Sequence, residues 1–227
     1  MSVYINEPVQ TPWACMIWMH GLGADAQDMM GLAQQLALTI PVRHVFIDAP
    51  IRPVSINNNI PMRAWYDIVG TSLLDRQDRQ GILASELMIR EVIEQQITQG
   101  LLPQQIFLAG FSQGGAMALF TGLRMPSSLG GIISLSAYLP LADDCNSALI
   151  IDTPIFLAAG QFDQIVLPQW TQQSQQWLLA RGYQDISMQY YPMEHSICFE
   201  EIQVLAEWIV SHVNRRNLHG VVVDDCC

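Results

Sequence analysis

The stretch QIFLAGFSQGGAMALFTGL, residues 105–123, joins a short apolar run to a serine flanked by glycines and then to a helix-forming run. Residues 106–109 have the length and apolar character of a buried strand, and residues 115–120 favour a helix. Between them, Gly110-Phe111-Ser112-Gln113-Gly114 matches G-x-S-x-G, in which the serine stands on a sharp turn between strand and helix. The stretch therefore predicts a strand, a tight turn and a helix, with Ser112 as a candidate nucleophile.

The rest of the chain alternates in the same way between strand-like and helix-like runs. Strands are expected at 15–19, 42–47, 106–109, 130–136, 154–159 and 186–191, and helices at 25–38, 82–98, 115–120, 169–181 and 199–213. Such alternation predicts an α/β fold with a mostly parallel central sheet and helices on both faces. We expect one domain over 1–213 and a flexible tail over 214–227.

The segment between the second strand and the second long helix has no clear periodicity. Residues 48–61 are rich in proline and asparagine and are expected to form a loop. Residues 65–68 are a brief β-prone segment, and residues 70–80 read as an irregular polar connection.

Composition restricts the function classes. Half of the 227 residues are hydrophobic, only 14% are charged, and the formal net charge is −11. Nucleic-acid binding needs basic patches, so nucleic acid is not expected as a partner, and such an acidic chain would gain little from anionic lipid surfaces. The amino terminus lacks a basic region and a long apolar core, and no apolar run reaches membrane-spanning length. We therefore expect a cytoplasmic protein without integral membrane association.

The five cysteines show no metal-ligand spacing, and their odd number in a reducing compartment favours free thiols. The sequence implies no metal and no organic cofactor.

A serine hydroxyl is a poor nucleophile until a base takes its proton, so a histidine and an orienting acid must follow in a suitable order. An ordinary glycine-rich turn with an incidental serine is the alternative. Of the histidines after Ser112, only His195 comes directly after a predicted strand. The acid must lie between the two, which leaves the five aspartates Asp143, Asp144, Asp152, Asp163 and Asp185.

Asp163 is favoured because it follows the strand expected at 154–159, where a carboxylate can accept the second N–H of the histidine and fix its tautomer. A plain turn aspartate is the alternative. Acyl transfer also needs N–H donors for a developing oxyanion. The backbone N–H of Gln113, at the start of a helix, and that of Leu22, in the loop His20-Gly21-Leu22-Gly23, are the candidates. His20 itself precedes the serine and is expected to be structural.

Several stretches together resemble one family. The chain is similar to the carboxylesterase/acyl-protein thioesterase family of α/β-hydrolases, which includes lysophospholipase-type enzymes, and the segment ending in AWYDI looks like its bacterial carboxylesterase branch. The matching stretches are HGLGADAQDM (20–29), RPVSINNNIPMRAWYDI (52–68), GFSQGGAMAL (110–119), LSAYLP (135–140), GQFDQIV (160–166) and MEHSIC (193–198).

The resemblance implies Ser112 as nucleophile, His195 as base and Asp163 as orienting acid, with Leu22 and Gln113 as oxyanion donors. It also suggests that residues 71–80, with Leu73 and Leu74, lie over an acyl channel that Trp65 lines or supports. Ordinary core or loop packing is the alternative for these last three residues.

Two features depart from the family or stand outside it. The position before the histidine is commonly glycine in this family and is Glu194 here, which either approaches the imidazole or turns to solvent. The tail ends in Cys226-Cys227, which does not match a C-a-a-X lipidation signal and is expected to carry exposed thiols.

The expected function is hydrolysis of carboxylic esters or thioesters with an apolar acyl group, through an acyl-enzyme. A small ester, a lysolipid or an S-acylated protein would be the substrate, and the sequence does not choose among them. A binding module without catalysis, or a peptidase or lactone hydrolase on the same fold, are the rival functions. A homodimer is left open.

Overall fold

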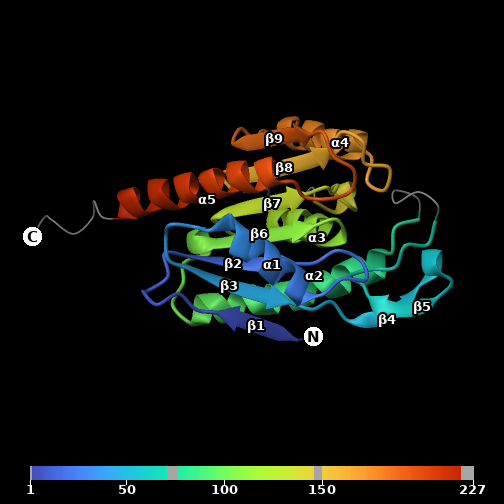
Figure 1. Ribbon diagram of the computed structural model, residues 1–227, viewed down its shortest axis with the longest axis horizontal. Coiled ribbons are helices and arrows are strands. Elements are labelled where there is room, and N and C mark those ends of the chain that lie inside the picture. Colours follow the sequence, from blue (N-terminus) through green and yellow to red (C-terminus); the bar gives the residue numbers. More distant parts are fainter. Residues whose placement is uncertain (1, 71–75, 146–149, 221–227) are drawn as a thin grey trace, which may run out of the picture.

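The fold is built on a central sheet of seven strands (Figure 1). The structure is a computed structural model that describes residues 2–70, 76–145 and 150–220, and for residues 216–220 it describes the backbone alone. The strand order is β1-β3-β2-β6-β7-β8-β9, and every neighbouring pair is parallel except β1 with β3. The strands are β1 (Val3–Asn6), β2 (Ala14–Met19), β3 (Val42–Ile47), β6 (Ile106–Phe111), β7 (Gly131–Leu135), β8 (Ile155–Gly160) and β9 (Ile186–Tyr191).

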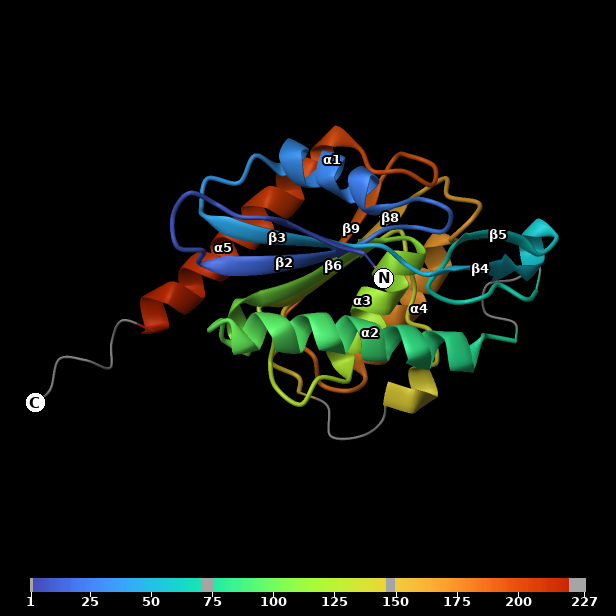
Figure 2. The same ribbon diagram turned by 90° about the horizontal axis from the view of Figure 1, so that it is seen from below.

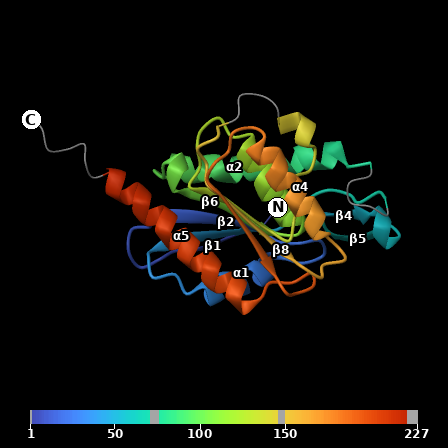
Figure 3. The same cartoon turned by 90° about the horizontal axis from the view of Figure 1, so that it is seen from above.

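Helices cover both faces of this sheet. Figures 2 and 3 show α1 (Ala26–Leu36) and α5 (Phe199–Gly220) on one face, and α2 (Arg79–Thr98), α3 (Gln113–Leu123) and α4 (Pro168–Leu179) on the other. The two layers of the core follow the two-residue period of the strands. In β2, Ile17 and Met19 pack into the core under α2, α3 and α4, whereas Met16 and Trp18 pack into the core under α1 and α5. The expected α/β-hydrolase architecture is confirmed.

Three segments differ from the sequence expectation. The edge strand β1 was not expected, because all four of its residues are exposed and show no buried alternation. The expected loop 48–61 is largely replaced by a separate antiparallel hairpin, which extends to residue 63. It consists of β4 (Ile51–Val54) and β5 (Ile60–Arg63), joined through the short 3-10 helix η1 (Ser55–Asn57). Its proline pair, Pro53 opposite Pro61, fits a two-stranded ribbon because no further strand needs their missing N–H groups. Residues 65–68 are not a strand.

Several helix boundaries also differ from the expected ones, those of α2 and α5 among them. α2 begins at Arg79, before the expected residue 82, because the Asp78 side chain accepts a hydrogen bond from the Gly81 N–H and caps the helix. α5 continues to Gly220, beyond the expected end at residue 213. The remaining short 3-10 helices are η2 (Pro103–Gln105) and η3 (Ala142–Cys145).

The topology makes a crevice at the carboxyl ends of β2 and β6. From β2 the chain moves outward to β3, then crosses back through α2 to β6 on the other side of β2. Ligands of open parallel sheets bind where the strand order reverses in this way. The loop after β2 carries Leu22, and the turn after β6 carries Ser112. The loops after β8 and β9 carry Asp163 and His195, so all four residues lie at the same edge of the sheet.

No described helix has both the length and the apolar character needed to cross a membrane. Within residues 2–70, 76–145 and 150–220, no cluster of three or more His, Cys, Asp or Glu side chains could hold a metal ion. Cys15, Cys145 and Cys198 are free thiols, and Cys226 and Cys227 lie outside the described residues.

Candidate active site

Ser112 occupies a strained turn between β6 and α3. Its backbone has φ 54° and ψ −121°, a conformation that residues other than glycine rarely adopt. Two backbone hydrogen bonds hold the turn, from Ser112 N–H to Leu135 O at 2.9 Å and from Ala116 N–H to Ser112 O at 3.0 Å. Gly114 is needed because a Cβ there would collide with the Met19 carbonyl at the end of β2. The motif thus brings the serine directly beside the loop that follows β2.

His195 lies between Ser112 and Asp163. Its Nε2 is 2.9 Å from Ser112 Oγ, and its Nδ1 is 2.7 Å from Asp163 Oδ2. A carboxylate only accepts hydrogen bonds, so the proton of a neutral His195 lies on Nδ1 and the Nε2 lone pair faces the serine hydroxyl. The ring of Phe111 stands against the imidazole with 4.8 Å between ring centroids. The structure brings together the three side chains that the sequence singled out.

Asp163 is buried and held on both of its oxygens. Oδ1 accepts the backbone N–H groups of Ile165 and Val166 at 2.8 and 2.9 Å, which leaves Oδ2 directed at His195. These two N–H donors from the loop after β8 therefore fix the orientation of the carboxyl group. Asp152 and Asp185, which chain order also permits, do not contact His195.

The loops that carry Asp163 and His195 are tied to each other. Gln161 N–H donates to Tyr191 O at 2.8 Å, and Phe162 N–H donates to Met193 O at 3.0 Å. Gly160 lies where they meet, because a Cβ on it would clash with the backbone carbonyls of Met193 and Glu194. The acid and the base are therefore positioned as one unit.

Leu22 and Gln113 both border the cavity in front of Ser112. Gln113 is the first residue of α3, so its backbone N–H has no acceptor inside the helix. The loop with Leu22 passes close to the nucleophile, since a Cβ on Gly21 would lie 3.4 Å from Ser112 Cβ. Gly23 N–H donates to Arg63 O of β5 at 2.9 Å, which ties this loop to the hairpin.

Trp65 supports the site through hydrogen bonds and is not among the described residues that line the cavity. Its side chain is fully buried, and its indole N–H donates to His20 O at 2.9 Å. The Gln113 side chain clamps the same segment, accepting from Trp65 N–H and donating to Tyr66 O, both at 2.7 Å. Leu73 and Leu74, the other residues expected at an acyl channel, lie outside the described residues.

The cavity in front of Ser112 has a volume of about 270 Å³ and a mainly apolar lining. Ile68, Ile165 and Val166 contribute aliphatic side chains. Tyr66 and Tyr138 also border it, with their hydroxyl oxygens 3.1 Å apart. Sequence reasoning quoted the stretches that hold all five residues but assigned none of them, because strand and loop patterns do not show which side chains converge on one hollow.

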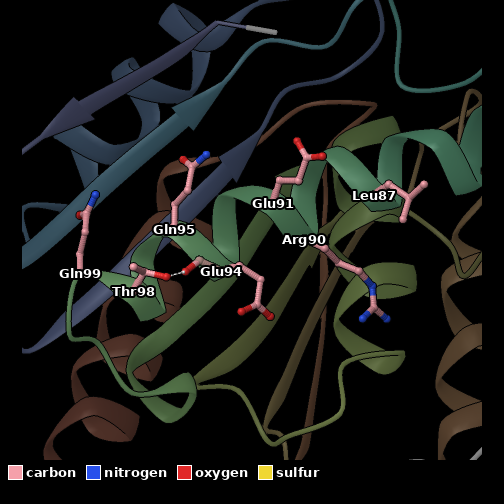
Figure 4. Close-up of a pocket in the computed structure, with 7 residues that line it drawn as sticks. All are labelled: Leu87, Arg90, Glu91, Glu94, Gln95, Thr98 and Gln99. Atoms are coloured by element: carbon pink, nitrogen blue, oxygen red, sulfur yellow. Dashed lines mark hydrogen bonds between the residues drawn. The ribbon is translucent and has the colours of Figure 1, made fainter.

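A larger hollow of about 630 Å³ lies elsewhere, along the outer side of α2 (Figure 4). Figure 4 shows polar and charged side chains along it, with Leu87 the single apolar one. All of its lining residues come from one helix and its end, namely Leu87, Arg90, Glu91, Glu94, Gln95, Thr98 and Gln99. None of the predicted site residues belongs to this surface.

Glu194, the departure from the family pattern, is exposed. The carboxylate that pairs with His195 in the described part of the chain is that of Asp163. His20 is fully buried, and burial lowers its pKa. His44 is half-buried in β3 and accepts a hydrogen bond from the Trp18 indole N–H at 3.0 Å.

Comparison with known proteins places this geometry in context. The model of the phospholipase/carboxylesterase family matches residues 2–213. Acyl-protein thioesterase 1 of Yarrowia lipolytica is 33% identical over 88% of this chain and 92% of its own, and that of Aspergillus fumigatus is 33% identical over 91% and 90%. The crystal structure of Arabidopsis thaliana SOBER1 superimposes with a TM-score of 0.82 at 27% identity, over 88% of this chain and 99% of that one.

Proposed function

The chain belongs to the phospholipase/carboxylesterase family and hydrolyses carboxylic esters or thioesters, and we propose that it does so through an acyl-enzyme on Ser112. The observation that carries this proposal is the continuous hydrogen-bonded series from Asp163 through His195 to Ser112, with distances of 2.7 and 2.9 Å. The apolar cavity beside Ser112 supplies the place for an acyl group.

In the first step Ser112 Oγ attacks the carbonyl carbon while His195 Nε2 takes the hydroxyl proton. Asp163 holds the Nδ1–H of His195 throughout, which stabilises the imidazolium and prevents the ring from turning. The carbonyl oxygen becomes an oxyanion, and the backbone N–H groups of Leu22 and Gln113 donate to it. The N-terminal end of α3 adds partial positive charge at the same point.

The second half returns the enzyme to its starting state. The tetrahedral intermediate expels a thiol or an alcohol, which receives the proton from His195 Nε2. Water then gives a proton to the neutral Nε2 and attacks the acyl-enzyme. Ser112 leaves as its hydroxyl when the second tetrahedral intermediate collapses, and the product is a carboxylic acid.

A fluorophosphonate probe tests the nucleophile. We expect one covalent label on the intact protein and none on Ser112→Ala, since the phosphorus reacts with an activated serine. Ser136→Ala is the matched control, because Ser136 is buried and outside the lining of the cavity, and it should keep the label. Label on Ser112→Ala would show that another serine is the nucleophile. A folded protein that takes no label would instead support a binding module without catalysis.

S-acylated proteins are the substrate class that we propose. The two fungal relatives compared above are named acyl-protein thioesterases, and the cavity lining suits an aliphatic chain. Each methylene buried contributes about 0.8 kcal/mol, so kcat/KM should rise about fourfold for each carbon that enters the cavity. Ile165→Ser should flatten that rise, whereas Ile51→Ser on the exposed face of β4 should not.

A comparison of three octanoyl substrates separates the substrate classes. An S-octanoyl peptide, an octanoyl ester of equal size and an octanoyl lysophospholipid are compared at matched concentration, and the thioester peptide is expected to have the highest kcat/KM. Preference for the lysophospholipid would assign the site to lipids, and preference for an acetyl over an octanoyl ester would contradict the acyl cavity.

Three finer expectations belong with this proposal. We propose a cytoplasmic location. The free thiols indicate a reducing compartment, and S-acylated proteins would be accessible to the enzyme there. The bacterial branch suggested by AWYDI stays a prediction, because the curated relatives compared above are fungal. Size-exclusion chromatography with light scattering would decide between a monomer and a homodimer.

A further inference from the structure

The loop that follows β2 is fixed by an unusual pair of hydrogen bonds to consecutive peptide groups. The His20 carbonyl accepts the Trp65 indole N–H at 2.9 Å, and the Gly21 carbonyl lies 2.7 Å from His20 Nδ1. The two carbonyls belong to the two peptide groups that precede Leu22. Together these bonds determine how the Gly21–Leu22 peptide plane is oriented.

The bond to the Gly21 carbonyl also determines where the Leu22 N–H points. The Gly21 C=O and the Leu22 N–H belong to one peptide group, and the described residues contain no cis peptide bond. In a trans peptide the C=O and the N–H point in opposite directions. Because the carbonyl is held toward the buried His20 ring, the N–H is directed away from it, and Leu22 borders the cavity in front of Ser112.

The His20 ring is itself held in one tautomer. Its Nε2 is 3.0 Å from Ala49 N, and a backbone N–H only donates, so Nε2 must be the acceptor. The proton of the neutral ring then lies on Nδ1 and is donated to Gly21 O. The side chain is fully buried, and burial lowers its pKa, which agrees with a neutral ring.

We propose that His20 is a positioning residue for the reaction, which orients the Leu22 N–H toward the oxyanion by holding the Gly21 carbonyl through Nδ1–H. The proposal rests on the proposed function, in which Leu22 is one of the two oxyanion donors. His20 touches neither substrate nor nucleophile and acts through one peptide plane. Its contribution should therefore show in kcat far more than in KM, since the oxyanion exists only in the transition state and intermediate.

Two amide variants separate the two ring nitrogens. The Nδ2 of asparagine lies where histidine has Nδ1, so His20→Asn keeps a donor for Gly21 O and loses the acceptor for Ala49 N–H. The end of a glutamine side chain reaches the Nε2 position, so His20→Gln keeps the acceptor and loses the donor at Nδ1. The expected kcat of His20→Gln is lower by about 100-fold, the cost of a misplacement near 1 Å, while His20→Asn stays closer to the wild type.

His44→Gln is the matched control. His44 is a half-buried histidine of β3 that is hydrogen-bonded to Trp18 in β2 and does not line the cavity. Its replacement should lower the unfolding temperature and leave kcat unchanged. Equal kcat values for His20→Gln and His20→Asn, or a wild-type kcat in His20→Gln, would overturn the proposal.

A trifluoromethyl ketone that forms a hemiketal with Ser112 gives a second measurement. In ¹⁵N-labelled wild-type protein the Leu22 amide signal should shift when the hemiketal oxyanion forms, and His20 should show the Nδ1–H tautomer. If the Leu22 amide does not shift, the oxyanion assignment under the proposed function fails. If it shifts but the ketone binds His20→Gln as tightly as wild type, only the role of His20 fails. An Nε2–H tautomer in the wild type refutes the role of His20 even where a variant does not fold.

Discussion

Replacing Asp163 with asparagine should abolish most catalysis while leaving the fold intact. In the native protein Oδ1 accepts two backbone N–H groups, from Ile165 and Val166. An amide nitrogen cannot accept hydrogen bonds, so the asparagine must keep its oxygen in that position. Its NH₂ group then faces His195 Nδ1. Because an NH₂ group donates, Nδ1 must accept this hydrogen bond and can no longer carry a proton.

The consequence is the wrong tautomer of the base. The proton of a neutral His195 moves to Nε2, which lies 2.9 Å from Ser112 Oγ and then has no lone pair to take the serine proton. The corresponding change in the best-characterised triad lowers kcat by about four orders of magnitude. At 1.36 kcal/mol per tenfold change, this is a loss of roughly 5 kcal/mol of transition-state stabilisation. KM should change little, because the acyl cavity is untouched.

Steady-state kinetics on a small neutral ester, together with thermal unfolding, would measure both effects. The unfolding temperature should stay close to that of the wild type, since both backbone N–H groups keep an acceptor. Asp185→Asn is the matched control, because chain order also allows Asp185 as the acid, yet its carboxylate lies beside His212 at 3.4 Å. A loss smaller than about tenfold in Asp163→Asn would refute the assignment of Asp163.

Three further predictions concern Glu194, Gly160 and Glu201. Glu194 is exposed and is not the carboxylate that pairs with His195, so Glu194→Gln should leave the acid limb of kcat/KM against pH unchanged; a downward shift of that limb would show that the charge tunes the base. Gly160→Ala should lower kcat by at least about tenfold, because its Cβ pushes the His195 loop away from Asp163, and unaltered kinetics would contradict this. Glu201 is buried and neither of its carboxyl oxygens has a hydrogen-bond partner among the described residues, and this burial raises its pKa from 4.5 to about 8. The folded protein then holds a proton that the unfolded chain releases, so the unfolding free energy should fall as pH rises through that window. Glu201→Gln should remove this pH dependence and raise the free energy of unfolding at pH 8.5 by up to roughly 4 kcal/mol relative to wild type, as measured by denaturant titration. If the difference in unfolding free energy between variant and wild type is the same at pH 5 and at pH 8.5, burial does not shift the pKa of this carboxyl group.

Much of the fold follows from local pattern. The runs 42–47 and 186–191 match β3 and β9 residue for residue, because both are rich in β-branched and aromatic residues, which favour strands. The hairpin β4–β5 and the edge strand β1 were not predicted. All residues of β1 are exposed, and β4 and β5 each contain a proline. These strands therefore form through pairing with a partner strand and show no local periodicity.

The G-x-S-x-G motif singled out Ser112, and chain order with strand ends then singled out Asp163 and His195, since parallel strands all deliver their carboxyl ends to one edge of the sheet. Only the tertiary structure decided how they are held. The two N–H groups on Asp163, the His20 bond to Gly21 O and the clamp of Gln113 on Trp65 join residues from separate loops. Such contacts depend on side-chain direction across tens of residues of sequence, and no local pattern of residue types records that direction.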